Sequence, residues 1–334
     1  MSQGLKFNIS RPPAGRPPLL LIFGSDTEAK AKAEGGYRFG GNSDVFRLLP
    51  EGLRFDQLNL SKQFLDRPGR PSPANYPLVL NLVTDPDQHP RTLERLGKLL
   101  RGHRGRVFNP PDKVLKTSRH QVAQRLTGID GLAVPKALRL ANPSPGEPSR
   151  AAGEAGLAFP VIVRRTGTHT GRIVGLVESA DQLESACAGR GDYFLIEFVD
   201  FVSADGLYRK YRFWSFGNRT VFKHVVISDQ WNVHNKDRER TMADRPDLIK
   251  EERQLLSRPE GDFPDRVHRV FDEVRSRLGL DFFGMDFSIG KDGRLILFEA
   301  NATMSYVMTF DPRFHYLTLA NEPARVAFRE MLRS

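Results

Sequence analysis

The chain has 334 residues, of which 39% are hydrophobic and 10% are aromatic, and its formal net charge is +10. This apolar content excludes a disordered chain, and the length predicts two or three lobes. The single cysteine, Cys187, excludes an internal disulfide and a cysteine-rich zinc site, and its neighbours predict a buried place in a helix. Because no signal-peptide core and no run of about 18 apolar residues occurs, we expect a cytoplasmic protein without a membrane span.

The positive charge is compatible with two kinds of partner. Nucleic acid would be bound through its phosphates, whereas a small polyanion would be attracted into a cleft by the field of clustered cations. The basic residues are scattered along the chain, and no nucleic-acid-binding motif is found. The sequence therefore favours a small anionic ligand.

The first part of the chain alternates between strand and helix patterns. Apolar runs predict strands over residues 18–24, 76–83 and 106–109, and leucines at helical spacing predict a helix over 91–100. This alternation predicts a small α/β lobe, which we place at residues 1–108. A single helix is predicted next, over residues 112–126, after two prolines.

The rest of the chain is richer in strand patterns. A loop is predicted over 141–149, where three prolines and two serines occur in close succession. Strands are predicted over residues 159–165, 172–177, 193–199, 208–217 and 220–228, and helices over 262–278 and 321–332. We expect a mixed α/β (α+β) protein with two further domains, 109–198 and 199–334.

Two apolar segments near the C-terminus flank an Asp-Gly pair, which is a strong hairpin signal. If Asp292 and Gly293 form a two-residue turn, Asp286 lies opposite Glu299, and Asn301 falls on the same face. Two opposed carboxylates repel each other unless a cation or a proton lies between them. Because all these donors are oxygens, the pattern predicts Mg²⁺ or Mn²⁺ rather than zinc.

The same register makes a second prediction about the hairpin. Its other face would pair Phe287 with Phe298 and Ile289 with Ile296, giving an apolar surface that packs on a core. The alternative reading is that Asp286 and Glu299 are solvated charges on an exposed sheet face. The strongly apolar flanking residues favour the metal site.

A short glycine-containing loop joins two of the predicted strands. Between Gly167 and Gly171 it carries Thr168, His169 and Thr170, and small residues of this kind let backbone amides turn toward an anion. Most such hairpin loops bind nothing, so this loop is evidence for phosphate binding only in combination with the other motifs.

Together these motifs, in this order along residues 109–306, resemble those of the ATP-grasp superfamily. The resemblance implies that the proline-initiated strand carries Arg164 to the phosphates of ATP, where the family usually has lysine. It implies a loop over the triphosphate, a hinge that grips adenine, and an acid for the ribose, matched here by Thr168, His169, Thr170 and Gly171, by Glu197, Phe198 and Val199, and by Asp205. A second family lysine matches either Lys113 or Lys116, with Lys116 taken as the candidate.

The resemblance also implies a fold, a metal site and a reaction. The nucleotide would lie between two α+β lobes that follow a small α/β lobe, with Mg²⁺ or Mn²⁺ on Asp286, Glu299 and Asn301. A small-molecule or peptide carboxylate would attack ATP, and an amine or other nucleophile would capture the acylphosphate. Lys210 and Arg212, two apart on one strand and so on one face, would serve this chemistry.

Two other functional classes stay open at this point. One is a catalytically silent nucleotide-binding or regulatory module, suggested by Arg164 and by the absence of a clear substrate-side cation. The other, less favoured, is a basic nucleic-acid-binding protein.

A polar and aromatic set follows the basic strand. It comprises His224, Trp231, Asn232, His234 and Asn235, and convergent groups of this kind set the orientation of a ligand in a pocket. We interpret it as a candidate wall of the acceptor site. A plain hydrogen-bonded loop with one packed tryptophan explains the pattern equally well.

Overall fold

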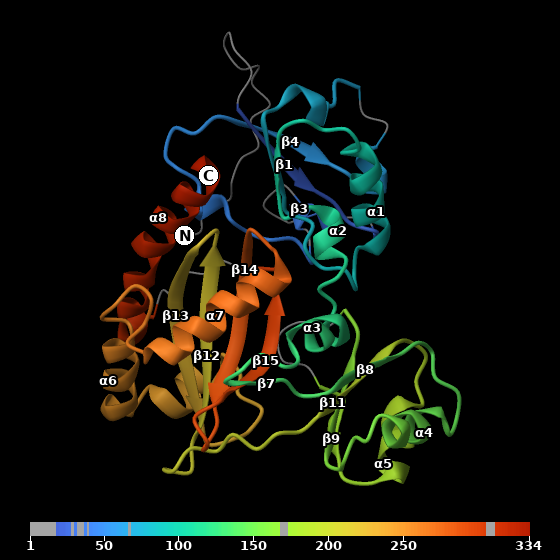
Figure 1. The fold of residues 1–334 in the computed structure, drawn as a ribbon, viewed down its shortest axis with the longest axis vertical. Helices are drawn as coiled ribbons and strands as arrows, with labels where there is room; N and C mark the ends of the chain where they lie inside the picture. The colour runs from blue at the N-terminus through green and yellow to red at the C-terminus, as the bar shows by residue number, and fades with distance from the viewer. Residues whose placement is uncertain are drawn as a thin grey trace. The chain divides into compact units, whose positions relative to one another are not determined.

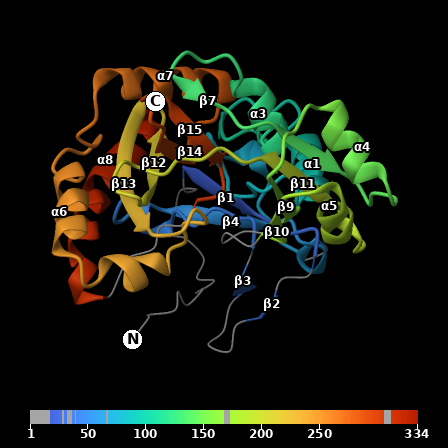
Figure 2. The same cartoon turned by 90° about the horizontal axis from the view of Figure 1, so that it is seen from below.

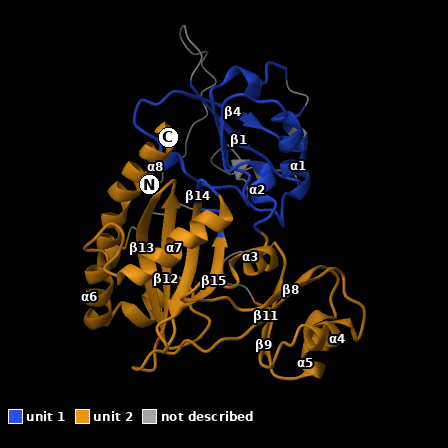
Figure 3. Cartoon of the chain, viewed as in Figure 1, with its two compact units in different colours: residues 1–117, 280–282, 301–306 blue, residues 118–279, 283–300, 307–334 orange. Residues whose placement is uncertain are grey.

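The computed structural model describes residues 18–27, 30–31, 37–38, 40–65, 68–167, 173–304 and 311–334. The chain divides into two compact units, shown in Figure 3. The first comprises residues 1–117, 280–282 and 301–306, and the second comprises residues 118–279, 283–300 and 307–334. Both units combine helices with sheets, as the sequence predicted. The division into three domains at residues 108 and 198 stays a prediction.

A four-stranded parallel sheet forms the centre of the first unit, in the order β4-β1-β5-β6. The strands are β1 (Leu19–Phe23), β4 (Phe55–Asn59), β5 (Leu78–Asn81) and β6 (Arg106–Phe108), with helix α1 at Pro90–Leu99. Every residue of β1 is buried, which explains its unbroken apolar sequence. The smaller elements are β2 (Lys30–Ala31), β3 (Tyr37–Arg38) and three 3-10 helices (Phe46–Leu48, Lys62–Phe64 and Pro73–Asn75).

The side chain of Asn109 forms hydrogen bonds with residues 280–282 within the first unit. Asn109 is fully buried and has a positive φ of 50°, a conformation that asparagine tolerates better than most residues. Its Oδ1 accepts hydrogen bonds from the backbone N–H groups of Asp281 (2.7 Å) and Phe282 (3.1 Å), and its Nδ2 donates to the Phe282 carbonyl (2.8 Å).

The prediction of a single helix over 112–126 is wrong, because the chain forms two helices there. They are α2 (Pro111–Val114) and α3 (Arg119–Leu126). The Thr117 hydroxyl donates to the carbonyl of Val114 (2.7 Å), and Ser118 is extended, with φ −62° and ψ 153°. Threonine and serine favour such local bonds over continued helix. As a result, a new helix begins at Arg119.

The second unit contains a small antiparallel sheet in the order β10-β9-β11-β8. Its strands are β8 (Ala137–Leu140), β9 (Val161–Arg165), β10 (Gly175–Val177) and β11 (Tyr193–Glu197). Helices α4 (Glu147–Glu154) and α5 (Ala180–Cys187) cover one face (Figure 2). Cys187 is buried in this core, as predicted, and burial raises the pKa of its thiol to about 11, so the thiol is inert.

A larger sheet in the second unit has the order β13-β12-β14-β15-β7. Its strands are β7 (Leu132–Ala133), β12 (Tyr208–Phe216), β13 (Arg219–Ser228), β14 (Phe282–Ile289) and β15 (Leu295–Asn301). Helix α7 (Asp265–Leu278) lies across one face (Figure 1), where Phe271 packs on Phe213 with ring centroids 4.3 Å apart. The remaining elements are α6 (Pro246–Leu255), α8 (Asn321–Arg333), a π-helix (Arg238–Met242) and a 3-10 segment (Pro312–Ala320).

The hairpin of β14 and β15 forms, but its predicted register is wrong by one residue at the turn. Gly290 N–H donates to the Arg294 carbonyl (2.8 Å), so Arg294 faces Gly290 instead of Lys291. Gly293 has φ 78°, which allows a three-residue turn in place of the expected two-residue one. Such a shift changes which side chains share a face.

The packing of the two phenylalanines agrees with this correction. Phe287 packs on Phe271 of α7, whereas Phe298 packs on Phe201, in a separate cluster with Ile296. The prediction that Phe287 and Phe298 share one apolar surface is therefore wrong. The positions of Asp286 and Glu299 rest instead on their ion pairs, described below.

Within the described ranges, no helix combines the length and the apolar character that crossing a membrane would require.

Candidate functional site

One row of side chains crosses the small sheet on the face opposite α4 and α5. Arg164 of β9 and Arg139 of β8 both lie opposite Phe194 of β11, on either side of it. Burial and the charge of Arg119 lower the pKa of Arg164 to about 10, and Glu299 opposes that shift. Arg164, Arg119 and Glu299 are thus electrostatic neighbours.

Arg119, the first residue of α3, is a site residue that sequence reasoning missed. Its Nη2 lies 3.4 Å from Oε2 of Glu299, and its Nη1 donates to the carbonyl of Phe298. Lys113 and Lys116, the candidates weighed for this stretch, belong to the first unit, and their contact with nucleotide stays a prediction. The signal for Arg119 was the Thr117-Ser118 pair, which starts a new helix directly before a basic residue.

Arg212 and Asp286 form a two-point ion pair between β12 and β14. Nη2 of Arg212 lies 2.8 Å from Oδ2 of Asp286, and Nε donates to Oδ1. Asp286 is only 7% exposed. Burial lowers the pKa of Arg212, but the charges of Asp286 and Glu299 outweigh burial and raise it.

Lys210 lies two residues before Arg212, and both belong to the same electrostatic neighbourhood. Its Nζ donates to the carbonyl of Val233 at 2.6 Å. Burial lowers the pKa of Lys210, and so do Arg212 and Arg164, whereas Asp286 and Glu299 raise it. Each group therefore senses the charges of the others.

These side chains define what we call the charge cluster. It consists of Arg119, Arg164, Lys210, Arg212, Asp286 and Glu299. These six side chains are four cations and two carboxylates. Fixed cations grouped in this way favour a polyanionic ligand.

Two of the three predicted metal ligands belong to the charge cluster. Asp286 and Glu299 contribute carboxylate oxygens, and Asn301 ends β15 two residues beyond Glu299. Oxygen donors of this kind suit Mg²⁺, so the residues fit the ion. Arg212 and Arg119 hold the two carboxylates, and a metal would compete with them. Among the described residues, no group of three or more His, Cys, Asp or Glu side chains is arranged to hold a metal.

The predicted hinge follows directly after β11. Glu197 is bonded to Lys136 twice: its Oε2 accepts from the Lys136 N–H (2.9 Å), and its own N–H donates to the Lys136 carbonyl (2.9 Å). The Phe198 ring meets Trp231 edge-on, with centroids 5.4 Å apart. Val199 packs in the cluster that contains Phe298. The hinge thus adjoins the polar and aromatic set that follows β13.

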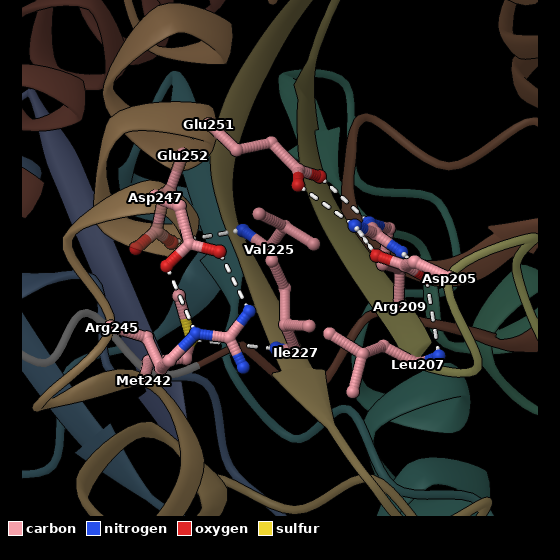
Figure 4. A network of polar contacts seen from close by, with 10 residues as sticks. All are labelled: Asp205, Leu207, Arg209, Val225, Ile227, Met242, Arg245, Asp247, Glu251 and Glu252. Atoms are coloured by element: carbon pink, nitrogen blue, oxygen red, sulfur yellow. Dashed lines mark hydrogen bonds and ion pairs between the residues drawn. The ribbon is translucent and has the colours of Figure 1, made fainter.

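Asp205, the predicted ribose acid, is engaged in an ion-pair network (Figure 4). Its two oxygens accept from Arg209 at 2.9 and 2.8 Å, which holds the pKa of Asp205 at about 2. Arg209 also bonds Glu251 at 2.8 and 2.9 Å. The Arg209 side chain is only 14% exposed. A role for Asp205 in ribose binding stays a prediction.

The loop predicted to cover the triphosphate lies outside the described residues from its second threonine onward. This applies to Thr168, His169, Thr170 and Gly171. Gly167, at the start of the loop, has φ 64°. The role of this loop stays a prediction.

The candidate acceptor wall divides into two kinds of residue. His234 is bonded within its own loop, since its Nδ1 accepts from the Lys236 N–H (3.2 Å) and its N–H donates to Asp237 (2.7 Å). His224, by contrast, lies directly opposite Arg212 on the neighbouring strand. The plain reading of a hydrogen-bonded loop suits His234, while His224 adjoins the charge cluster.

Known structures share this architecture over nearly the whole chain. The D-Ala:D-Ser ligase VanG from Enterococcus faecalis matches with a TM-score of 0.55 at 12% identity, covering 95% of this chain and 100% of VanG. The ATP-grasp ligase PsnB, solved with a minimal precursor, Mg and ADP, matches with a TM-score of 0.53 at 14% identity, covering 97% and 100%. A RimK domain ATP-grasp protein from Sphaerobacter thermophilus matches with a TM-score of 0.50 at 13% identity, covering 92% and 99%.

No family model matches the sequence, and no curated protein matches it. The structural likeness nevertheless extends over both units and over the full length of the matched chains. The protein therefore has the ATP-grasp fold, as the order of its sequence motifs predicted.

Proposed function

We propose that the protein is an ATP-dependent ligase that activates a carboxylate as an acylphosphate and joins it to an amine or another nucleophile. The observation that carries this proposal is the charge cluster, in which four cations surround two carboxylates on the sheets of an ATP-grasp fold. The solved neighbours VanG and PsnB, which are described as ligases, support it.

The residues would divide the work as follows. Arg119 and Arg164 would hold the phosphates of ATP, since fixed guanidinium groups bind phosphate oxygens through paired hydrogen bonds. Asp286, Glu299 and Asn301 would hold Mg²⁺, which would neutralise charge on the transferred phosphoryl group. Arg212, once released by Asp286, and Lys210 would face the anion that is being activated.

The substrates belong to a broad class. VanG is described as a D-Ala:D-Ser ligase and PsnB as bound to a precursor, so the matched folds include one named for free amino acids and one that binds a precursor. A small-molecule or peptide carboxylate together with an amine is the corresponding proposal for this chain.

One observation favours a second function. Arg212 engages both oxygens of Asp286, so a metal would have to displace Arg212 to bind this carboxylate. A nucleotide-binding module without catalytic activity would retain such a pair after nucleotide binding. The two functions differ in whether ADP is formed when acids are supplied.

The first experiment measures thermal unfolding with and without Mg-ATP. A ligand at a hundred times its dissociation constant stabilises a protein by about 2.7 kcal/mol, which raises the midpoint by a few degrees. We expect the wild type to show this shift only when magnesium is present. Asp286→Asn should show a smaller one. A shift unaffected by magnesium and by Asp286→Asn would contradict the metal assignment.

The second experiment separates the two functions. ATP, magnesium and hydroxylamine are supplied with the twenty proteinogenic amino acids, D-alanine and the dicarboxylates from malonate to adipate, and ADP and hydroxamates are measured. Hydroxamate formation with at least one acid supports the ligase. Nucleotide binding without ADP formation on any acid supports the silent module. A steep loss of nucleic-acid affinity with salt, without a Mg-ATP shift, would support the nucleic-acid binder.

A further inference from the structure

His224 lies in line with the two residues that form the central ion pair of the charge cluster. It is opposite Arg212 on β13, and Arg212 in turn bonds Asp286 on β14. Neighbouring strands are about 4.8 Å apart, so β13 lies about 10 Å from β14. A group bound at Asp286 and extending across Arg212 would reach His224.

The β13 strand departs from regular pairing next to His224. Arg212 pairs with His224 but Phe213 pairs with Phe222, so Lys223 is an extra residue in a β-bulge. Bulges re-aim side chains and are frequent beside active sites. The Lys223 ammonium lies 4.8 Å from the centroid of the Trp214 ring, and Trp214 is two residues beyond Arg212 on β12. The bulge therefore directs Lys223 as well as His224 to the Arg212 side of the sheet.

The backbone beside His224 is held in place by a buried ion pair. Val225 N–H donates to Oε1 of Glu252 (3.0 Å), and the Val225 carbonyl accepts from Nη2 of Arg238 (3.1 Å). Figure 4 shows Glu252 bonded to the Val225 N–H. Because both backbone groups of the next residue are fixed by side chains, the position of His224 is well defined.

The imidazole of His224 has no polar partner among the described residues. Over the described ranges of the chain, no hydrogen bond or ion pair to its ring is found, and the side chain is only partly buried. Burial lowers its pKa well below the usual value, and so do four cations around it: Arg238, Arg212, Lys223 and Lys210. The ring is therefore neutral near pH 7, with a lone pair available to a ligand.

We propose that His224 is the catalytic residue that accepts the proton of the incoming amine during capture of the acylphosphate. This inference rests on the proposed ligase function. The amine nitrogen forms a bond to the acyl carbon, phosphate leaves with the electron pair of the C–O bond, and the nitrogen's surplus proton passes to an imidazole nitrogen of His224. Release of that proton to solvent restores the neutral ring.

A weak base suffices for this step. The ammonium proton becomes much more acidic once the nitrogen is bonded to the acyl carbon, so a neutral imidazole can remove it. The four neighbouring cations disfavour a positive charge on the ring, which makes release of the proton to solvent rapid. General bases of this kind contribute about 10²-fold to 10⁴-fold to rate.

The test compares two nucleophiles of similar size. Both nucleophiles attack as free bases and carry a surplus proton once the C–N bond has formed. Because hydroxylamine is the much weaker base, its adduct passes that proton readily to water, whereas the methylamine adduct depends more on a general base. With the acid that gives most hydroxamate in the screen above, wild type and His224→Gln are assayed for hydroxamate and for methylamide. We expect His224→Gln to lose at least tenfold in methylamide formation and less than threefold in hydroxamate formation.

The control is His315→Gln, which changes an exposed histidine of the second unit. It should leave both rates and the thermal midpoint unchanged. The methylamide rate of His224→Gln should also approach that of the wild type at high pH, where hydroxide can accept the proton, since a packing role would not produce this convergence.

The possible outcomes separate the two proposals. Selective loss of methylamide formation supports the role of His224. Equal loss of both products, or retention of both, overturns that role and leaves the ligase function intact. Absence of hydroxamate from the wild type with every acid overturns the ligase function and, with it, this inference.

Discussion

Two arginine–carboxylate pairs differ in how completely their charges are balanced: Arg238 and Glu252 join the π-helix to α6, whereas Arg212 and Asp286 join β12 to β14. Glu252 is fully buried and accepts from Arg238 (2.5 and 2.9 Å), from the Val225 N–H (3.0 Å) and from the Tyr316 hydroxyl (2.5 Å). Asp286 is paired with Arg212, but Lys210 and further arginines surround that pair. The first pair satisfies its own charges and serves the fold. The second lies among further cations, which is the basis of the proposed ligand site.

The largest effect is expected at the balanced pair. Glu252→Ala leaves the Arg238 guanidinium buried without its partner, which should lower the free energy of unfolding by about 3–5 kcal/mol. Urea unfolding followed by circular dichroism measures this loss. A decrease below about 1 kcal/mol would show that water or another group replaces the carboxylate, and the distinction between the pairs would fail.

In contrast to Glu252→Ala, Asp286→Asn should strongly reduce activity and hardly change stability. The amide keeps a hydrogen bond to Arg212 but holds a metal poorly, so ADP formation on the selected acid should fall at least 100-fold, or about 2.7 kcal/mol in activation free energy. The thermal midpoint without nucleotide should move by only a few degrees. Glu251→Gln, which changes a carboxylate bonded to Arg209 on the same strand, is the matched control and should retain ADP formation.

The lowered pKa of Lys223 makes the stability of the protein depend on pH. Burial and the charges of Arg238 and Arg212 lower its pKa from 10.5 to about 8, so between these values the unfolded chain binds more protons than the folded one. Wild-type stability should therefore rise from about pH 8 to pH 10 relative to Lys223→Met, by an amount on the order of 1–3 kcal/mol. Equal pH dependence in the two proteins would contradict the assignment. Urea midpoints at each pH supply the measurement.

The smallest effect is expected at an exposed pair. Arg150 and Glu154 lie 3.1 Å apart on α4, with side chains 63% and 65% exposed. Solvent and salt screen such a pair, so Glu154→Ala should lower stability by at most about 0.5 kcal/mol, and less at high salt. A loss comparable with that of Glu252→Ala would mean that burial does not govern these pairs.

The regular elements of the fold could be predicted from the sequence because their patterns are local. The buried strand β1, the long strands β12 and β13, and helix α7 were predicted close to their observed bounds. The errors arose where one residue changes the geometry. Gly293, with its positive φ, lengthens the hairpin turn, and Thr117 ends a helix through its own side chain.

The candidate site was only partly predictable, because its ion pairs join distant parts of the chain. Arg212 and Asp286 are 74 residues apart, and Arg119 and Glu299 are further apart still. The family pattern indicated Arg164, Arg212, Asp286 and Glu299 as a set. It did not indicate Arg119, because that residue enters the site only through the helix break. Nor did it indicate that Arg209 is bound between Asp205 and Glu251, since this depends on how α6 packs.

The long edge strand β13 is protected against pairing with another chain. At Val225, both backbone groups are bonded to Glu252 and Arg238, the Ile227 N–H bonds the Met242 sulfur (3.4 Å), and the Phe222 N–H bonds the Pro259 carbonyl (2.8 Å). An added strand would have to break these bonds. The same contacts therefore limit aggregation through this edge, and a peptide substrate, if there is one, must be recognised through its side chains or its terminus instead of by strand addition there.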